Sequence, residues 1–189
     1  MRQPLLVHFV ESLKRLAEEG LGPTRGRARL VRVEPLGQGG APVVLDLAPD
    51  PELVRAVRVR FLTPTELKWR GTLAAQPEFP ALFARIRDRL SSLAALYGRK
   101  PLEIDFKALG ERAGRVIMVR SRMAHVSVTR RSSKTGQTHP IGGFTGEAEY
   151  RGELAEFVPY LRAAAWTGVG RQTVWGNGVI EVHPVKSAD

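Results

Sequence analysis

One structural unit occurs twice in this sequence: an amphipathic helix, a glycine-bearing loop and a short apolar strand. The apolar helix positions and the glycines recur at one spacing, as Phe9, Val10, Leu13, Ala17, Gly20 and Gly22 and as Phe157, Val158, Leu161, Ala165, Gly168 and Gly170. A short apolar strand follows each loop, at residues 30–33 and 179–182. Because a unit that recurs at fixed spacing indicates a repeated architecture, the chain is predicted to carry two copies of one fold element.

The second copy has a longer loop that contains charged and aromatic residues. Residues 168–178 read Gly-Val-Gly-Arg-Gln-Thr-Val-Trp-Gly-Asn-Gly. A glycine-rich loop between a helix and a strand can bring backbone N–H groups close to a phosphate. The alternative is that Gly20 and Gly168 only end their helices in the left-handed conformation. Arg171 and Trp175 favour phosphate binding for the second loop, whereas capping suffices for Gly20.

The chain carries a large excess of positive charge. It has 29 Lys and Arg against 19 Asp and Glu, which gives a net charge of +10 and an isoelectric point near 10.8. No acidic residue occurs between Glu111 and Glu147, a stretch that is rich in arginine. This distribution predicts a nucleic-acid partner, because arginine is suited to bidentate phosphate contacts. A GC-rich genome or a thermophilic source would also raise the arginine content, so the distribution is the stronger indication.

The composition excludes several classes of function. The chain has no cysteine, which removes disulfides, thiolate nucleophiles and cysteine zinc sites. No histidine or carboxylate spacing predicts a metal site, and we expect no cofactor. No apolar run reaches the ~20 residues that span a bilayer, and we expect a cytoplasmic protein. The loop at 168–178 lacks both a dinucleotide fingerprint and a P-loop, and Ser132 and Ser133 lack a hydrolase nucleophile elbow.

Hydrophobic periodicity predicts a complete domain at residues 51–185. Its predicted elements are a strand at 53–62, a helix at 78–97, a strand at 115–129, a polar loop at 130–138, a strand at 141–150, a helix at 153–166 and a strand at 172–183. This order is that of the ferredoxin-like split βαβ fold, an α+β arrangement with an antiparallel sheet and two helices on one face. Gly142 and Gly143 predict a bulge or a close backbone approach in their strand.

Residues 1–50 are predicted to be the remnant of a second, preceding ferredoxin-like domain. They contain an amphipathic helix at 4–19, a glycine loop and strands near 28–34 and 42–47. These elements match only the last helix, loop and strand of the complete domain. The helix must therefore pack on the second domain, on these two strands or on another chain.

Several segments in combination resemble the CRISPR-associated repeat-processing endoribonucleases of the RAMP (repeat-associated mysterious protein) superfamily. The segments that carry the resemblance are 61–68, 131–134, 141–147, 157–161 and 167–178. The resemblance implies two tandem ferredoxin-like domains that bind a repeat of precursor CRISPR RNA. It also implies metal-independent cleavage by attack of a 2′-OH on the adjacent phosphate. The general acid/base histidine of this family usually lies in the first domain, of which residues 1–50 would keep only a part.

Metal-independent cleavage needs a base, an acid and a cation beside the phosphate, and few residues here qualify. His8 lies on the polar side of the first helix, His125 lies within a strand, and His183 lies near the terminus. His139 directly follows the basic loop that contains Lys134. His139 and Lys134 are therefore the catalytic candidates, with a purely structural role as the alternative for each.

The resemblance and the charge pattern together predict the RNA-binding residues. The predicted set is Arg130, Arg131, Ser132, Ser133, Gly168, Gly170, Arg171, Gln172, Thr173, Trp175, Gly176 and Gly178. Loop amides and Arg171 would hold phosphate, and Trp175 would either stack on a base or close the core. Arg58 and Arg60 project from one strand face and would help to bind RNA unless another element covers them.

Three functions follow as hypotheses. The first is binding and metal-independent processing of CRISPR repeat RNA. The second is a non-catalytic RAMP subunit that holds guide RNA, with other CRISPR-associated proteins or a second copy of the chain as partners. The third is a basic protein-interaction module without an RNA function, in which charge reversal at the arginines would leave RNA behaviour unchanged.

Overall fold

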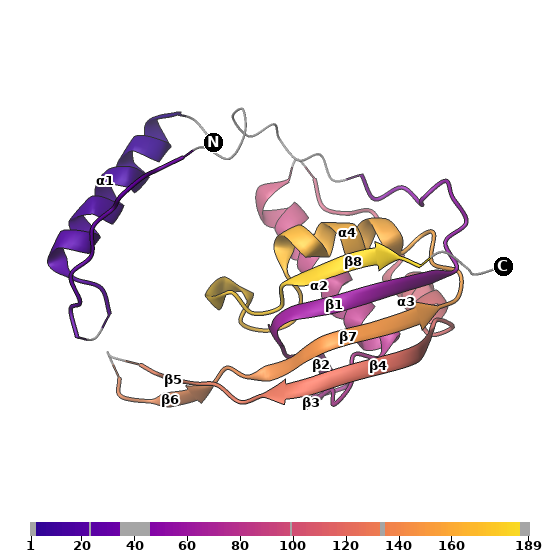
Figure 1. Cartoon of the computed structure of the whole chain (residues 1–189). Helices are drawn as coiled ribbons and strands as arrows, with labels where there is room; N and C mark the ends of the chain where they lie inside the picture. Colours follow the sequence, from indigo (N-terminus) through magenta and orange to yellow (C-terminus); the bar gives the residue numbers. More distant parts are fainter. Residues whose placement is uncertain (1–2, 23, 35–45, 99, 133–134, 186–189) are drawn as a thin grey trace. The chain divides into compact units, whose positions relative to one another are not determined.

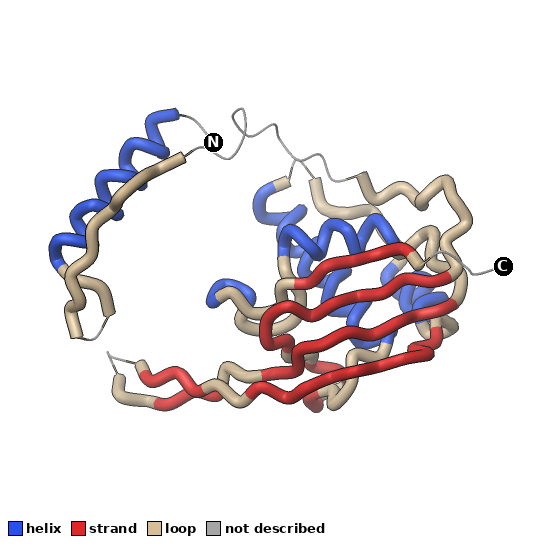
Figure 2. The backbone as a smooth tube through the Cα atoms, in the orientation of Figure 1, coloured by secondary structure: helices blue, strands red, loops and turns tan. Residues whose placement is uncertain are grey.

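The structure, a computed structural model, describes residues 3–22, 24–34, 46–98, 100–132 and 135–185. The chain divides into two units, Met1–Leu45 with Ser133–Thr135, and Asp46–Ser132 with Gly136–Asp189. The second unit contains the sheet shown in Figures 1 and 2.

The predicted N-terminal helix is confirmed as α1 (Gln3–Glu19). Gly20 follows it with φ +101°, and its N–H donates to the Leu16 carbonyl at 3.0 Å, which closes the last turn. The strand predicted near 28–34 is wrong, because these residues form no β-ladder and only the Ala28 N–H bonds back to α1, at Ala17. Of the strand predicted at 42–47, residues 42–45 lie outside the described residues, and residues 46–47 form no strand.

The second unit has the predicted ferredoxin-like topology. In chain order its main elements are β1 (Ala56–Thr65), α2 (Phe79–Tyr97), β4 (Ile117–Val126), β7 (Gly143–Arg151), α4 (Val158–Thr167) and β8 (Ile180–Pro184). The strand order in the sheet is β4-β7-β1-β8, and every neighbouring pair is antiparallel. The first and third strands of the split βαβ unit are therefore central, as this fold requires.

Helices α2, α3 (Phe106–Ala113) and α4 cover one face of this sheet (Figures 1 and 2). Val57, Val59 and Phe61 of β1 point into the core, which confirms the predicted alternation. Phe83 lies edge-to-face with Phe157 at 4.7 Å between ring centroids, and this contact joins α2 to the start of α4. Burial raises the pKa of Tyr150, whose hydroxyl donates to the Pro77 carbonyl at 2.6 Å.

Two helix predictions need correction. Helix α4 begins at Val158 and not at residue 153, and Pro159 accordingly lies in the first turn, where its missing N–H has no cost. Helix α3 is absent from the prediction, although the Asp105 side chain caps it by accepting from the N–H groups of Lys107 and Ala108. It is short, and only Leu109 and Ala113 of its residues are buried.

The strand predictions need correction at their ends. The polar loop predicted at 130–138 is in part a ladder, formed by β5 (Thr129–Arg131) and β6 (Thr138–Pro140). The strand predicted at 172–183 begins only at Ile180, because residues 173–175 form a 3-10 turn, η1, and Gly176 and Gly178 follow with positive φ. A further hairpin, β2 (Lys68–Trp69) with β3 (Thr72–Leu73), was not predicted.

Candidate nucleic-acid interface

The β5–β6 hairpin and the glycine loop at 168–178 lie against each other in the second unit. The Arg130 guanidinium lies over the Trp175 ring, 4.8 Å from its centroid. The Gln172 side chain donates to the Pro140 carbonyl at 3.0 Å, and Asn177 donates to the Ile141 carbonyl at 2.7 Å. The fold thus brings the two basic regions, predicted separately from the sequence, into one surface. We call it the hairpin–loop surface: residues 129–132, 136–140 and 168–178.

The glycine loop is fixed by the end of β1. The Gly178 N–H donates to the Pro64 carbonyl at 3.1 Å, and the Arg171 N–H donates to the Glu66 carbonyl at 3.0 Å. A Cβ on Gly178 would lie 1.9 Å from the Val169 carbonyl oxygen, and one on Gly170 would lie 2.4 Å from that of Glu66. Backbone therefore packs on backbone here, which only glycine permits.

Most N–H groups of the glycine loop are already bonded within the protein. Gly168, at φ +72°, donates to the Ala164 carbonyl and so caps α4, as the capping interpretation of this glycine requires. The N–H groups of Val169, Trp175 and Gly176 bond to carbonyls of the same loop. Its glycines thus shape the loop, and phosphate contacts would fall mainly to side chains.

The side chains of the hairpin–loop surface differ in whether they already have a partner within the protein. Among the described residues, Arg130 and Arg131 have no acidic partner, and both are exposed. Trp175 is 49% exposed, so it is not part of the core. Arg171, by contrast, forms an ion pair with Glu66 at 2.5 Å.

The polar side chains of Gln172 and Thr173 make contacts within the protein that hold the glycine loop in its conformation. Gln172 adopts a left-handed conformation, φ +63°, and its side-chain oxygen accepts from Asn177 at 3.2 Å. Its side-chain nitrogen donates to the Pro140 carbonyl of the hairpin, so both the oxygen and the nitrogen of this amide are hydrogen-bonded within the protein. Thr173 begins η1, and its methyl group lies beside Gly168. Residues at unusual φ tend to gather at functional sites, where the surrounding structure holds them in place.

The two catalytic candidates are placed differently. His139 lies in β6, is exposed, and is the cross-strand partner of Arg130. Cross-strand partners have Cβ atoms about 5 Å apart, so the imidazole and the guanidinium can reach one phosphate. Ser133 and Lys134 lie outside the described residues, and Ser132 is half-buried at the end of β5.

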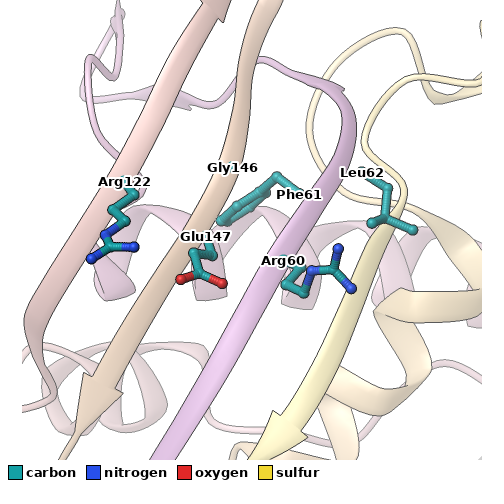
Figure 3. Close-up of a pocket in the computed structure, with 6 residues that line it drawn as sticks. All are labelled: Arg60, Phe61, Leu62, Arg122, Gly146 and Glu147. Carbon is teal, nitrogen blue, oxygen red and sulfur yellow. The ribbon is translucent and has the colours of Figure 1, made fainter.

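The face of the sheet opposite the helices is lined by charges of both signs. In the register of the strands, Glu147 stands between Arg60 and Arg122, and Figure 3 shows these three side chains on neighbouring strands. They line a shallow hollow of about 460 Å³. Arg60 also pairs with Glu181 at 2.9 Å. Oppositely charged cross-strand neighbours stabilise a sheet modestly and neutralise each other.

Arg58 is compensated in the same way. It lies 3.7 Å from Glu149, a largely buried carboxylate that Arg151 also contacts at 3.2 Å. In the free protein Arg58 and Arg60 are therefore both paired with glutamates, and a role for them in RNA binding stays a prediction.

The acid-free stretch between Glu111 and Glu147 obtains its counter-charges from elsewhere in the chain. Arg112 forms a bidentate pair with Glu156, at 2.7 and 2.8 Å, and this hydrogen bonding raises the pKa of the guanidinium. Arg120 and Arg122 lie opposite Glu149 and Glu147 of β7. Within the described part of the stretch, Arg115, Arg130 and Arg131 are exposed and have no acidic partner, and the last two lie on the β5–β6 hairpin.

The described residues form neither a metal cluster nor a membrane-spanning helix. In the part of the chain that the structure describes, no three His, Cys, Asp or Glu side chains gather in a way that would hold a metal ion. The helices described there include none long and apolar enough to cross a membrane.

The sequence prediction missed two residues of this site. Glu66 holds Arg171, and Asn177 bonds to the hairpin base while being 8% exposed. Glu66 lies in the segment 61–68 that carries the family resemblance, but its partner is distant in sequence, so nothing local indicated its role. Asn177 stands between Gly176 and Gly178, where a turn residue was the simpler interpretation.

Comparison with solved structures shows the same fold. Thermus thermophilus Cas6 superimposes with a TM-score of 0.54 at 22% identity, over 70% of this chain and 55% of that chain. Two Cas6 product complexes match with TM-scores of 0.63 and 0.53 at 23% and 20% identity, over 96% and 95% of this chain and 72% of each of theirs. The chain thus spans about half the length of the first of these. No curated protein shows a significant match.

The family comparison covers the ferredoxin-like unit. The model of the family described as CRISPR-associated endoribonuclease Cas6 matches residues 59–180, from β1 to the first residue of β8. This range includes the hairpin, the glycine loop and Glu66. The chain belongs to the Cas6 family of CRISPR-associated endoribonucleases.

Proposed function

We propose that this chain binds CRISPR repeat RNA and takes part in its metal-independent processing. One observation carries the proposal: the hairpin and the glycine loop of this Cas6-family chain form a single surface, on which Arg130 and Arg131 have no acidic partner among the described residues. The partner is RNA, with other CRISPR-associated proteins or a second copy of the chain as further partners. The protein would act in the cytoplasm.

RNA would contact side chains of the hairpin–loop surface. Arg130 and Arg131 would follow the phosphates, and Trp175 would stack one exposed face of its ring on an unpaired base. Arg171 would supply a further cation beside the loop. Residues 51–185 carry this surface, while residues 1–50 are proposed to remain from a preceding ferredoxin-like domain.

Cleavage would proceed without a metal. The 2′-oxygen attacks the adjacent phosphorus, its proton passes to a base, and the leaving 5′-oxygen takes a proton from an acid. The products are a 2′,3′-cyclic phosphate and a 5′-OH. His139 is the candidate for proton transfer, and Arg130 and Lys134 would stabilise the phosphorane charge.

The His139→Ala variant tests the catalytic part of the proposal. We expect the cleavage rate to fall by about 100-fold, because loss of a general acid or base has that scale, while the Kd for RNA stays within about twofold. Single-turnover cleavage of labelled repeat RNA, with anisotropy for binding, measures both. His183→Ala, an exposed histidine in β8, is the matched control and should cleave like the parent. Equal rates in the two variants would show that His139 is not catalytic.

The open sheet face provides a test of where RNA binds. Replacing Arg58 and Arg60 by glutamine should change the Kd for repeat RNA by no more than about twofold at 0.15 M salt, because both side chains are compensated by glutamates. Fluorescence anisotropy with labelled RNA measures the change. A tenfold loss would place RNA on the sheet and contradict the proposed location.

A further inference from the structure

Glu66 sits where an anion would otherwise bind. Its side chain is 14% exposed, and its Oε1 accepts from the Nη1 of Arg171 at 2.5 Å. The Arg171 side chain is 55% exposed, so its remaining donors face solvent. A carboxylate and a phosphate oxygen use the same geometry toward a guanidinium. Glu66 therefore occupies a position that a phosphate oxygen would take.

The backbone holds this carboxylate in place. The Arg171 N–H donates to the Glu66 carbonyl at 3.0 Å, and Gly170 leaves no room for a side chain against that same carbonyl. The Glu66 backbone cannot move away without opening the glycine loop. The guanidinium, at the end of a flexible side chain, is the group that can turn toward another anion.

The arginines of the hairpin show a different arrangement. Arg130 lies over Trp175, and neither it nor Arg131 has an acidic partner among the described residues. Among the arginines of the described hairpin–loop surface, Arg171 is thus the one whose charge is neutralised in the free protein. A lone phosphate gains little there, whereas RNA already held at the hairpin brings its phosphate to Arg171 at high local concentration.

We propose that Glu66 competes with RNA phosphate for Arg171 and thereby restricts this position to a polyanion that also contacts the hairpin. This inference rests on the proposed RNA-binding function. Glu66 is a residue that determines ligand specificity through Arg171, and it does not itself touch RNA. Arg171 changes partner when RNA binds, from the carboxylate to a phosphate.

The test compares Glu66→Gln with the parent for binding of labelled repeat RNA across a salt series. Glutamine keeps the shape and the acceptor oxygen but removes the charge, so affinity at low salt should rise by about fivefold. The double variant Glu66→Gln/Arg171→Gln should show no such gain in RNA affinity, because the cation for which carboxylate and phosphate compete is absent. Glu153→Gln is the matched control: Glu153 pairs with Arg55 at 3.2 Å beyond the other end of β1, and its loss changes the net charge equally.

Binding of inorganic phosphate to the protein without RNA, measured by calorimetry, tests the restriction to polyanions. Phosphate should bind more tightly to Glu66→Gln than to the parent, and equal binding to the two proteins would contradict the restriction. Thermal unfolding of each variant verifies that the loop remains folded.

Each outcome bears on one claim. A gain in Glu66→Gln that disappears with Arg171→Gln and is absent in Glu153→Gln supports the competition. An unchanged or weaker affinity of Glu66→Gln, or an equal gain in Glu153→Gln, would overturn it while leaving RNA binding intact. Parent protein that fails to bind RNA at low salt would contradict the proposed function itself.

Discussion

Reversing Arg130 and Arg131 to glutamate is expected to weaken repeat-RNA binding by about 100-fold at 0.15 M salt, since two phosphate contacts are lost and two repulsions gained. Both arginines lie in β5, are exposed, and have no compensating acid among the described residues. The plot of log K against log salt has a negative slope, and the magnitude of this slope should decrease by about 1.5, because each phosphate contact releases counterions. A titration series between low and moderate salt measures both quantities.

A charge-matched variant distinguishes the loss of RNA contacts at the hairpin from the general effect of a lower net charge on RNA affinity. Lys107 and Arg115 are exposed, lie outside the hairpin–loop surface, and have no acidic partner in the part of the chain that the structure describes. Reversing both changes the net charge by the same amount and should weaken binding by less than about fivefold at this salt, because distant charges are screened. Equal losses in the two double variants would show that the hairpin has no special role.

Replacing Gly178 by alanine is expected to destabilise the second unit by about 4 kcal/mol, because a backbone clash adds to a strained φ. Its φ is +74°, and a Cβ would lie 1.9 Å from the Val169 carbonyl oxygen, which is backbone and cannot turn aside. The pairing between Gly178 and Val169 that closes the glycine loop would open. The expected fall in Tm is about 10 °C for a chain of this size, and calorimetry or circular dichroism measures it.

Gly176 is the matched control in the same loop. Its φ is +86°, but a Cβ there would meet nothing within 4 Å. Gly176→Ala therefore carries only the cost of a left-handed alanine, about 1 kcal/mol. If both alanine variants lose the same stability, the close packing of the loop on itself does not hold it closed.

The arrangement of the second unit could be predicted because its longest elements have strong periodicity. Alternation in β1 and three–four spacing in α2 are carried by side chains that are buried in the structure, such as Val59 and Ile86. Each pattern fixes an element, and the order of elements then fixes the ferredoxin-like topology. Gly98 ends α2, as predicted, with its N–H bonded to the Ala94 carbonyl.

The elements that were missed depend on tertiary contacts or are too short to show a period. Helix α3 buries only Leu109 and Ala113, so its pattern is one helical turn. The β5–β6 ladder consists of exposed polar residues, and it forms where the chain leaves the paired strands β4 and β7. Neither strand of this ladder shows a hydrophobic alternation that the sequence could reveal.

The candidate site was predictable as two segments but not as one surface. Nothing local places Arg130 over Trp175, since that contact requires the fold to bring β5 beside the glycine loop. The compensation of Arg58 and Arg60 likewise depends on cross-strand register, which pairs them with glutamates distant in sequence. Charge counted along the sequence therefore overstates the basic surface, because the register compensates the arginines of β1 with glutamates.

The most direct test of RNA binding at the hairpin–loop surface measures binding and cleavage in one sample. The purified chain is incubated with labelled CRISPR repeat RNA in EDTA, and halves of the sample are run on a native and on a denaturing gel. We expect a shifted complex and a discrete product that ends in a 2′,3′-cyclic phosphate, and we expect both to be lost when Arg130 and Arg131 are replaced by glutamate. A shift without cleavage would instead identify a subunit that only holds RNA. No shift at low salt would contradict the central claim that the hairpin–loop surface binds RNA.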